Sequence, residues 1–492
     1  MHKPVLQLIG GNVLSKILGA AREILMAALF GTGASMGAFR VAQTGTLAPV
    51  HFFTSDSFNA AFIPLYKKHL ISSPNKAQTL LWGLLALFLF LSLLLAGFLW
   101  ALSTRWVEVI APGLDLDVAA LSSDMLRVMA VGMPFYIFST VLMFLCMGND
   151  DFVPTTFRPS VQNLGLICGV FAAFMLRNMV LLAWGFTISY IAFSVWLVHR
   201  ALSSGFLAFP EVWLWPEFRE VMLNFWLTLR PLVFLPLMLQ GNIVIERLVA
   251  SLIGIVAISS LDYAKFISET LMFLVAFPLA QVGLSRWSSL ENQEIKERLK
   301  KTLFLISFVA MPVSAFLAVN AGLVVEVLYA RGAFDAKSVS VTSEILFGIS
   351  LGLWAQAAGY VLIKALNAQL CNAAVFRIMV IALLANGAFN LVLYPYLGPL
   401  TLGIGNTVYG IMLYAGTLHA LGLWADAFET CWGIVLGCLG YFFLNSMIPL
   451  FDTVWENIAI FGGFALVYWF ILSITIPRWR AEIIELVSAS KR

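Results

Sequence analysis

Apolar stretches of membrane-spanning length follow one another along almost the whole chain, separated by short polar connections. About 20 apolar residues cross the ~30 Å hydrocarbon layer of a membrane as a helix, and the alternating pattern of a membrane barrel is absent. The pattern therefore predicts an all-α polytopic membrane protein. The fourteen predicted spans are 5–31, 37–66, 79–103, 126–148, 156–177, 179–199, 225–253, 256–286, 302–322, 339–366, 372–394, 400–423, 430–450 and 456–476.

Composition agrees, because 61% of the 492 residues are hydrophobic and only 11% are charged, too few to coat a water-soluble protein. The first apolar run is interrupted by Lys16, Arg22 and Glu23 and is followed by no small-residue cleavage site. We therefore expect a first membrane helix, not a removable signal. Residues 287–301 and 216–222 show the polar patterns of surface helices, and residues 478–492 form a basic tail that suits either a membrane interface or solvent.

Charge bias predicts that both termini are cytoplasmic. With the N-terminus inside, fourteen Lys and Arg residues fall in or beside the cytoplasmic connections and four in the outward ones. This asymmetry follows the positive-inside rule. The outward four are Arg105, Arg177, Arg331 and Lys337.

A weak internal repeat suggests two lobes. Shifted by 223 residues, Glu23, Gly31 and three nearby positions match Glu246, Gly254 and their neighbours, at the same place in spans 1 and 7. We expect two six-helix lobes, related by a parallel pseudo-twofold axis around a central cavity, plus two extra C-terminal helices. The predicted parts are an N-lobe (1–202), a cytoplasmic connector (203–224), a C-lobe (225–424), spans 13 and 14 (425–477) and the basic tail (478–492).

Charged residues inside the spans carry the functional argument, because a charge at the bilayer centre costs about 2.5–3.5 kcal/mol and usually faces a cavity or a ligand. On span 2 a polar face runs from Arg40 to Ser55, and on span 8 Asp262, Lys265 and Glu269 share a face. The predicted substrate-binding residues are Lys16, Arg22, Arg40, His51, Lys265 and Arg230, with Glu23, Glu246, Asp262 and Glu269 as charge partners.

Each of these residues also has a structural interpretation. Lys16 with Glu23, or Lys265 with Asp262, would serve as an ion pair, and Arg230, which precedes Pro231, would cap or kink a helix entrance. Snorkelling is the default for the basic residues near span ends. These are Arg127, Arg158, Arg286, Lys364 and Arg377.

The excess of cations predicts an anionic cargo, with phosphate favoured because a guanidinium donates two parallel hydrogen bonds to it. No nucleotide-binding loop, catalytic constellation, metal-ligand spacing or basic aromatic patch for nucleic acid occurs. We therefore expect a transporter, not an enzyme, without cofactor or metal and driven by a gradient, the membrane potential or consumption of the cargo. The five cysteines lack paired spacing, so we expect buried free thiols.

Four segments resemble those of the MurJ/MviN lipid II flippases of the multidrug/oligosaccharidyl-lipid/polysaccharide exporter superfamily. Residues 15–23 read S-K-I-L-G-A-A-R-E and precede F-G-T-G at 30–33, residues 58–64 read F-N-A-A-F-I-P, and residues 328–334 read L-Y-A-R-G-A-F. The resemblance runs in order through most of the chain. It implies a multi-pass protein of the bacterial inner membrane that moves an undecaprenyl-pyrophosphate-linked saccharide to the outer leaflet by alternating access.

The resemblance places that family's cavity arginines at Lys16, Arg22 and His51, each at least potentially cationic. Other positions depart from the family pattern: Gly37 and Ser55 replace acidic residues, and Lys265 and Phe266 replace an Asp-Arg pair. The flippase interpretation stands, with lipid II or a related lipid-linked oligosaccharide as cargo.

Two further transporters and one enzyme class stay open as alternatives: an exopolysaccharide repeat-unit flippase, a cation-coupled multidrug exporter, and a glycan polymerase or ligase. The exporter requires a net acidic cavity, and the polymerase requires large external loops. The expected partners are the lipid-linked pyrophosphate, membrane lipids and, for a coupled transporter, a monovalent ion. We expect a monomer, because the predicted site lies within one chain.

Overall fold

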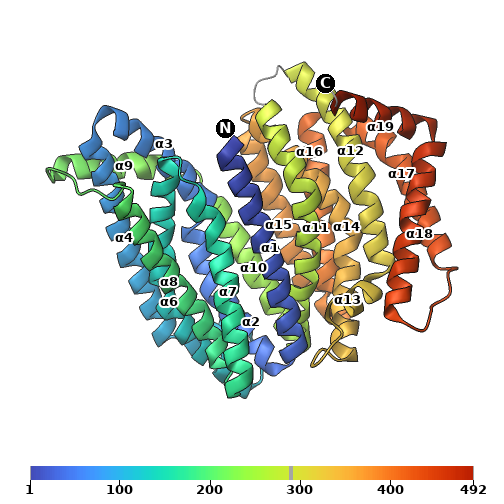
Figure 1. Cartoon of the computed structure of the whole chain (residues 1–492), viewed down its shortest axis with the longest axis horizontal. Helices are drawn as coiled ribbons and strands as arrows, with labels where there is room; N and C mark the ends of the chain where they lie inside the picture. The colour runs from blue at the N-terminus through green and yellow to red at the C-terminus, as the bar shows by residue number, and fades with distance from the viewer. Residues whose placement is uncertain (1, 288–291, 491–492) are drawn as a thin grey trace. The chain divides into compact units, whose positions relative to one another are not determined.

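The computed structural model describes residues 2–287 and 292–490, and these residues fold into nineteen α-helices without a strand (Figure 1). This confirms the all-α class. The helices are α1 (His2–Phe30), α2 (Ala34–Phe53), α3 (Asp56–Ser72), α4 (Pro74–Ala101), α5 (Ser103–Ile110), α6 (Leu116–Gly148), α7 (Val153–Leu176), α8 (Val180–Ser203), α9 (Trp215–Leu229), α10 (Phe234–Ile253), α11 (Ile255–Trp287), α12 (Asn292–Val319), α13 (Ala321–Tyr329), α14 (Ala336–Ala368), α15 (Asn372–Leu397), α16 (Leu400–Leu421), α17 (Trp424–Asn445), α18 (Val454–Thr475) and α19 (Pro477–Ser490).

Each of the fourteen predicted spans coincides with a helix or a helix pair. Within the described residues, ten helices are long and apolar enough to cross a membrane, so the protein is a multi-span membrane protein. They are α4, α6, α7, α8, α10, α12, α14, α15, α17 and α18. The other four predicted spans coincide with α1, the α2–α3 pair, α11 and α16.

Two predicted spans are broken, contrary to the sequence prediction. Span 2 divides into α2 and α3 because the chain leaves helical geometry at Ser55, whose φ of −67° and ψ of 158° are extended. Thr54 and Ser55 are modest helix formers whose hydroxyls compete for backbone groups. Span 7 begins only at α10, because α9 ends at Leu229 and Pro231 has no N–H with which to continue a helix.

The polar segments at the two ends of the second half are also helical. The surface helix predicted at 287–301 and span 9 form the single helix α12, while residues 288–291 lie outside the described residues. The basic tail begins as α19, whose Trp479 is buried against Phe308 and Trp469. The start of the tail is therefore packed against helices, and is not a free chain in solvent.

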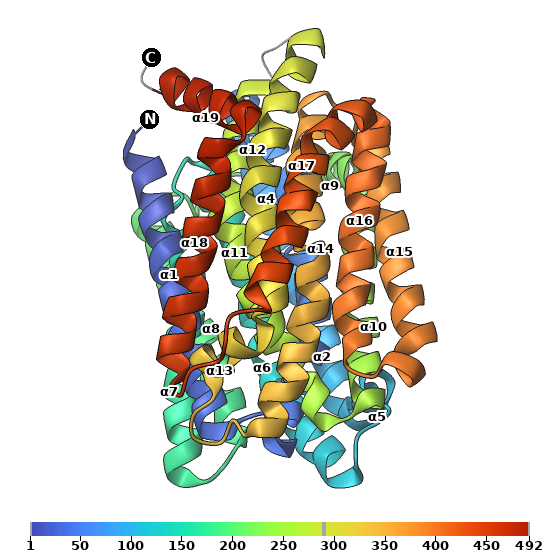
Figure 2. The same cartoon turned by 90° about the vertical axis from the view of Figure 1, so that its right-hand side faces the viewer.

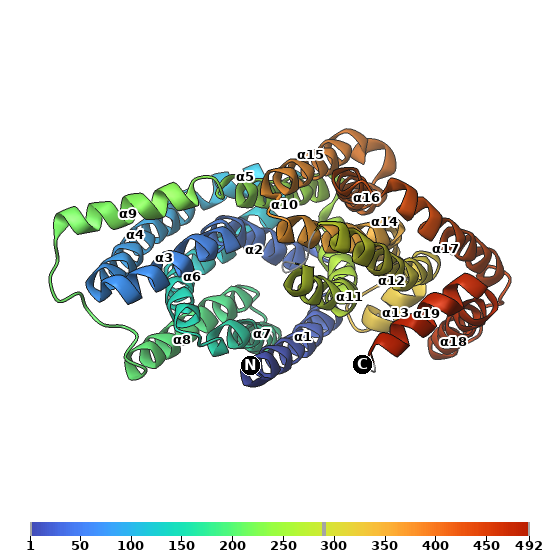
Figure 3. The same cartoon turned by 90° about the horizontal axis from the view of Figure 1, so that it is seen from above.

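The chain divides into two compact units, residues 1–259 and 260–492. In the first unit α6 is the central helix, packed against α2, α4, α5 and α8 (Figure 3). α10 also packs on α2 and α5 there, so this unit extends beyond the lobe boundary expected between residues 202 and 225. The lobes inferred from the internal repeat stay a prediction.

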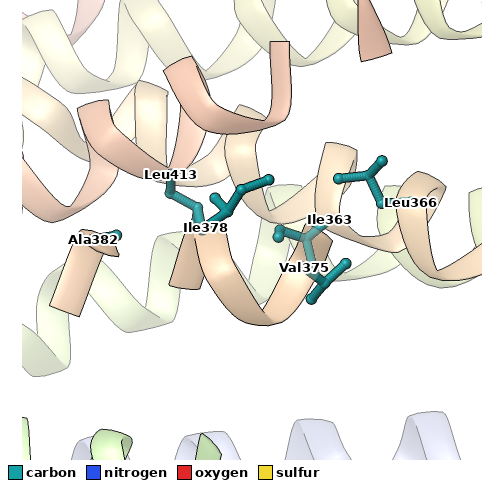
Figure 4. Close-up of a cluster of buried hydrophobic side chains, with 6 residues drawn as sticks. All are labelled: Ile363, Leu366, Val375, Ile378, Ala382 and Leu413. Atoms are coloured by element: carbon teal, nitrogen blue, oxygen red, sulfur yellow. The ribbon is translucent and has the colours of Figure 1, made fainter. Parts of the chain in front are cut away.

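In the second unit α14 is central and packs against α12, α15 and α16 (Figure 2). Buried aliphatic side chains of α14, α15 and α16 form one hydrophobic cluster (Figure 4). It consists of Ile363, Leu366, Val375, Ile378, Ala382 and Leu413. The R-G-A-F segment is a turn after α13, in which Gly332 has a φ of 62° and Phe334 packs on Tyr329 and Tyr263.

Candidate substrate-binding site

Two arginines from different helices meet on one carboxylate in the first unit. Arg22 and Glu23 lie side by side on α1, and Arg40 comes from α2; both guanidinium groups form ion pairs with Glu23. Glu23 and Arg40 are buried, and Arg40 also donates to the Gln43 side chain at 3.3 Å. We call Arg22, Glu23 and Arg40 the arginine cluster.

A third helix, α7, completes the surroundings of Arg22. The Asn163 side chain accepts a hydrogen bond from Arg22 at 2.8 Å and donates one to the Ser15 carbonyl at 3.0 Å. Arg22 keeps 15% of its side-chain surface exposed, and its Nε is buried without a hydrogen-bond partner in the described part of the chain. Arg22 therefore combines a fixed position with unused donor capacity.

The position of Arg22 favours an anion. Arg22 shares the Glu23 carboxylate with Arg40 and stays partly exposed among apolar helices. Removing charged groups from water costs several kcal/mol per ion, which a single pairing offsets only partly. A phosphate that approached Arg22 would add charge-assisted hydrogen bonds in the same low-dielectric region.

His51 and Arg158 share an aromatic neighbour. Tyr136 of α6 is close to both: its ring centroid is 6.3 Å from the His51 ring and 3.9 Å from Arg158 Cζ. The Tyr190 ring of α8 follows, 4.1 Å from that of Tyr136. The snorkelling interpretation of Arg158 is wrong, because the guanidinium stacks on a ring within the first unit and its Nη2 is buried.

Arg247 is a buried cation that the sequence analysis overlooked. Its Nε donates to the Thr44 hydroxyl at 2.9 Å and one Nη donates to the Ile258 carbonyl at 2.6 Å. Glu246 beside it is buried and accepts from Asn242 at 3.3 Å. Arg247 therefore joins α10 to α2, and its place beside Glu246 in an apolar helix was the available signal.

The other predicted residues are distributed over both units. Lys16 is half-buried on α1, and Arg230 is exposed where α9 ends, the position that the capping alternative predicts. On α11 in the second unit, Asp262 and Lys265 are half-buried and Glu269 is exposed. The polar face of span 2 also divides, since Arg40 contacts α1, Thr44 contacts α10 and His51 contacts α6.

The thiols differ from the sequence prediction in their burial. All five cysteines are free, but Cys168 and Cys371 are exposed, and among the five only Cys146 is fully buried. Cys168 lies on an outer face of α7, and Cys371 lies in the short connection between α14 and α15, so neither is in the protein interior. No group of His, Cys, Asp and Glu suited to a metal ion occurs in the residues that the structure describes.

Comparison with known proteins gives one consistent result. Residues 26–456 match the family model described as lipid II flippase MurJ. A Rhizobium tropici protein described as "Probable lipid II flippase MurJ" is 29% identical over 447 residues, which cover 86% of this chain and 80% of that protein. A Vibrio cholerae protein of the same description is 23% identical over 464 residues, covering 90% and 88% of the two chains.

Two solved structures share the fold. One, described as lipid II flippase MurJ in an inward closed conformation, has a TM-score of 0.84 at 19% identity and covers 95% of this chain and 98% of its own. The other is an inward-facing MATE-family multidrug resistance transporter, with a TM-score of 0.69 at 13% identity over 84% and 95% of the two chains. At these identities the likeness concerns the fold alone.

Proposed function

Because the chain belongs to the MurJ lipid II flippase family, we propose that it moves lipid II, or a closely related undecaprenyl-pyrophosphate-linked saccharide, from the inner to the outer leaflet of the bacterial cytoplasmic membrane. Members of this family are transporters, and no enzymatic step is needed. The observation that carries the proposal is the Arg22 guanidinium, which is fixed by Glu23 and Asn163 and retains a buried, unpartnered donor.

Arg22 is the residue we assign to the pyrophosphate. Its planar guanidinium suits bidentate bonding to phosphate oxygens, and the carboxylate of Glu23 holds it in place until the ligand arrives. Arg40 contacts the same carboxylate and is more deeply buried, so we assign it a positioning role. Alternating access then carries the bound headgroup across while the lipid tail stays in the membrane.

Further polar residues of the chain are assigned supporting roles in the same transport cycle. We propose that Lys16 and Lys265 attract the anionic headgroup, that the His51 imidazole donates a hydrogen bond to it, with Arg230 at the entrance, and that the acidic residues moderate the local charge. These acidic residues are Glu246, Asp262 and Glu269. Both termini are proposed to be cytoplasmic, since the charge bias of the connections favours that orientation.

Transport in reconstituted vesicles tests the proposal. The full-length chain in proteoliposomes should move fluorescent lipid II between leaflets, and Arg22→Ala should slow this at least about a hundredfold, as expected for the loss of two charge-assisted hydrogen bonds. Arg105→Ala is the matched control, because this arginine of the same unit is 81% exposed. It should transport at the wild-type rate.

Three results would contradict this function. An Arg22→Ala protein that still transports lipid II would show that Arg22 is not the pyrophosphate-binding residue. Transport of an exopolysaccharide lipid precursor in place of lipid II would show that the chain carries the alternative cargo. Preferential export of a cationic dye would favour a drug exporter of the same fold.

A further inference from the structure

Arg158 has the properties of a ligand-binding residue, although it lies outside the arginine cluster. It is near the start of α7, and its guanidinium stacks over the Tyr136 ring at 3.9 Å. Among the described residues, no acidic side chain forms an ion pair with it, and its buried Nη2 has no hydrogen-bond partner. A buried N–H donor that lacks an acceptor costs about 1–3 kcal/mol, so its retention calls for an explanation.

A second unpartnered donor lies in the same region. The Tyr190 hydroxyl of α8 is buried without a hydrogen-bond partner in the described chain, and its ring contacts that of Tyr136. Arg22 is held to the same helix as Arg158, since Asn163 of α7 accepts a hydrogen bond from Arg22 at 2.8 Å. Arg22 Nε, Arg158 Nη2 and the Tyr190 hydroxyl thus provide three unsatisfied donors on α1, α7 and α8, and α7 packs against both of the other helices.

This arrangement differs from that of a structural arginine. Arg247 in the same unit shows the structural pattern, with its donors used by Thr44 and the Ile258 carbonyl. Arg200 pairs with the Asp151 carboxylate through two bonds, at 2.7 and 3.0 Å. Arg158 has the ring as support but neither a carboxylate nor a carbonyl to accept from Nη2.

We propose that Arg158 and the Tyr190 hydroxyl form a second phosphoryl position beside Arg22, so that the two guanidinium groups bind the two phosphates of the lipid-linked pyrophosphate. This assignment rests on the proposed function and specifies its headgroup recognition. Stacking on Tyr136 fixes the guanidinium plane, which leaves its edge to donate to phosphate oxygens. His51 of α2 also contacts this ring, but its side chain is an imidazole. The guanidinium at the ring therefore belongs to Arg158 of α7.

Binding of lipid probes to the full-length chain in nanodiscs tests the second phosphoryl position. The probes are undecaprenyl pyrophosphate, undecaprenyl phosphate, inorganic pyrophosphate and lipid II, with occupancy followed by native mass spectrometry. Arg158→Gln should lower the affinity for undecaprenyl pyrophosphate about ten- to a hundredfold. The affinity for undecaprenyl phosphate should fall less than about threefold. Arg158→Lys should retain part of the affinity, because it keeps the positive charge but loses the planar guanidinium that donates two parallel hydrogen bonds.

Tyr190→Phe provides an arm that does not depend on the folding of the Arg158 variants. It removes only the unpartnered hydroxyl and keeps the ring contact, so the thermal midpoint should stay at the wild-type value. The affinity for undecaprenyl pyrophosphate should fall about three- to tenfold. Arg105→Gln, which removes an exposed arginine, should bind all probes as the wild type does.

The outcomes separate this inference from the function on which it rests. If Arg22→Gln abolishes pyrophosphate binding while Arg158→Gln and Tyr190→Phe bind normally, the second position is wrong and the flippase stands. If the wild-type chain binds no lipid pyrophosphate, both proposals fail. Suppose that Arg158→Gln lowers the affinities for the monophosphate and pyrophosphate lipids equally, or lowers only the affinity for lipid II. Arg158 would then bind a part of the ligand other than the second phosphate, and the proposal would be wrong. Tight binding of inorganic pyrophosphate would identify the free anion as the ligand.

Discussion

In the first unit α2 meets α1 and α10 through buried charged side chains, whereas α14 and α16 of the second unit meet through glycine. In the first unit, Arg40 reaches Glu23 from α2 to α1, and Arg247 reaches Thr44 from α10 to α2. In the second unit, α14 and α16 approach so closely that a methyl group added at Gly403 would lie 2.4 Å from the Ile345 carbonyl oxygen. We call Gly348, Gly352, Gly403 and Gly410 the glycine seam.

The two kinds of contact respond differently to substitution and to ligands. A glycine seam gains stability from close backbone approach, and the Thr407 hydroxyl adds a hydrogen bond to the Gly348 carbonyl at 2.6 Å. Buried ion pairs contribute little net stability because each charge loses its hydration. Helix contacts that contain buried ion pairs are therefore suited to binding a charged ligand. The glycine seam is suited to keeping α14 and α16 in a fixed arrangement.

The largest expected effect comes from removing the shared carboxylate. Glu23→Gln leaves Arg22 without its counter-charge, so we expect the free energy of unfolding to fall by about 3–5 kcal/mol. Thermal unfolding of the detergent-solubilised protein measures this. Glu108→Gln is the control, since its pair with Arg105 is exposed and should be worth less than about 1 kcal/mol. Equal shifts for the two variants would mean that burial does not distinguish the arginine cluster.

The glycine seam should show an intermediate effect. Gly403→Ala forces α14 and α16 apart, and we expect a loss of about 1–3 kcal/mol in the free energy of unfolding. Gly462→Ala on α18 is the matched control, because the added methyl group meets no atom within 4 Å. It should be neutral or stabilising by up to about 1 kcal/mol. A Gly403→Ala protein as stable as the wild type would show that the seam tolerates separation.

The smallest effect is expected at the start of α14. The Ser338 hydroxyl and N–H both donate to Asp335, which lowers the pKa of that carboxyl below its usual value. Because the folded-state pKa is the lower one, this stabilisation is present above the unfolded-state value and is lost as the pH falls through the folded-state pKa. Asp335→Asn keeps a capping side chain but cannot titrate.

The measurement for Asp335 compares thermal midpoints of the two proteins between pH 7 and about pH 3. The wild type should be slightly more stable at neutral pH, and the difference should shrink in acid. A difference that grows as the pH falls would contradict this assignment. Neither result tests the arginine cluster, because Asp335 lies at a helix end of the second unit.

The apolar spans were readable from the sequence because the hydrocarbon layer imposes a minimum length on each helix. Charged residues within those spans were equally visible, and Arg22, Glu23 and Arg40 stood out because burial of charge in an apolar helix is costly. The family also followed from short motifs in the right order. Helix breaks at Ser55 and Arg230 were less readable, because single prolines and hydroxyl residues also occur inside continuous membrane helices.

What the sequence determined is the class of the protein and the identity of its intramembrane charges, since both depend on local composition and helix length. Only the tertiary structure decided which of those charges meet. Helical spacing fixes neighbours on one helix, but the pairing of Arg40 with Glu23 and the stacking of Arg158 on Tyr136 join different helices. Those contacts depend on how the helices rotate and pack, which is settled by interactions between residues far apart in the chain.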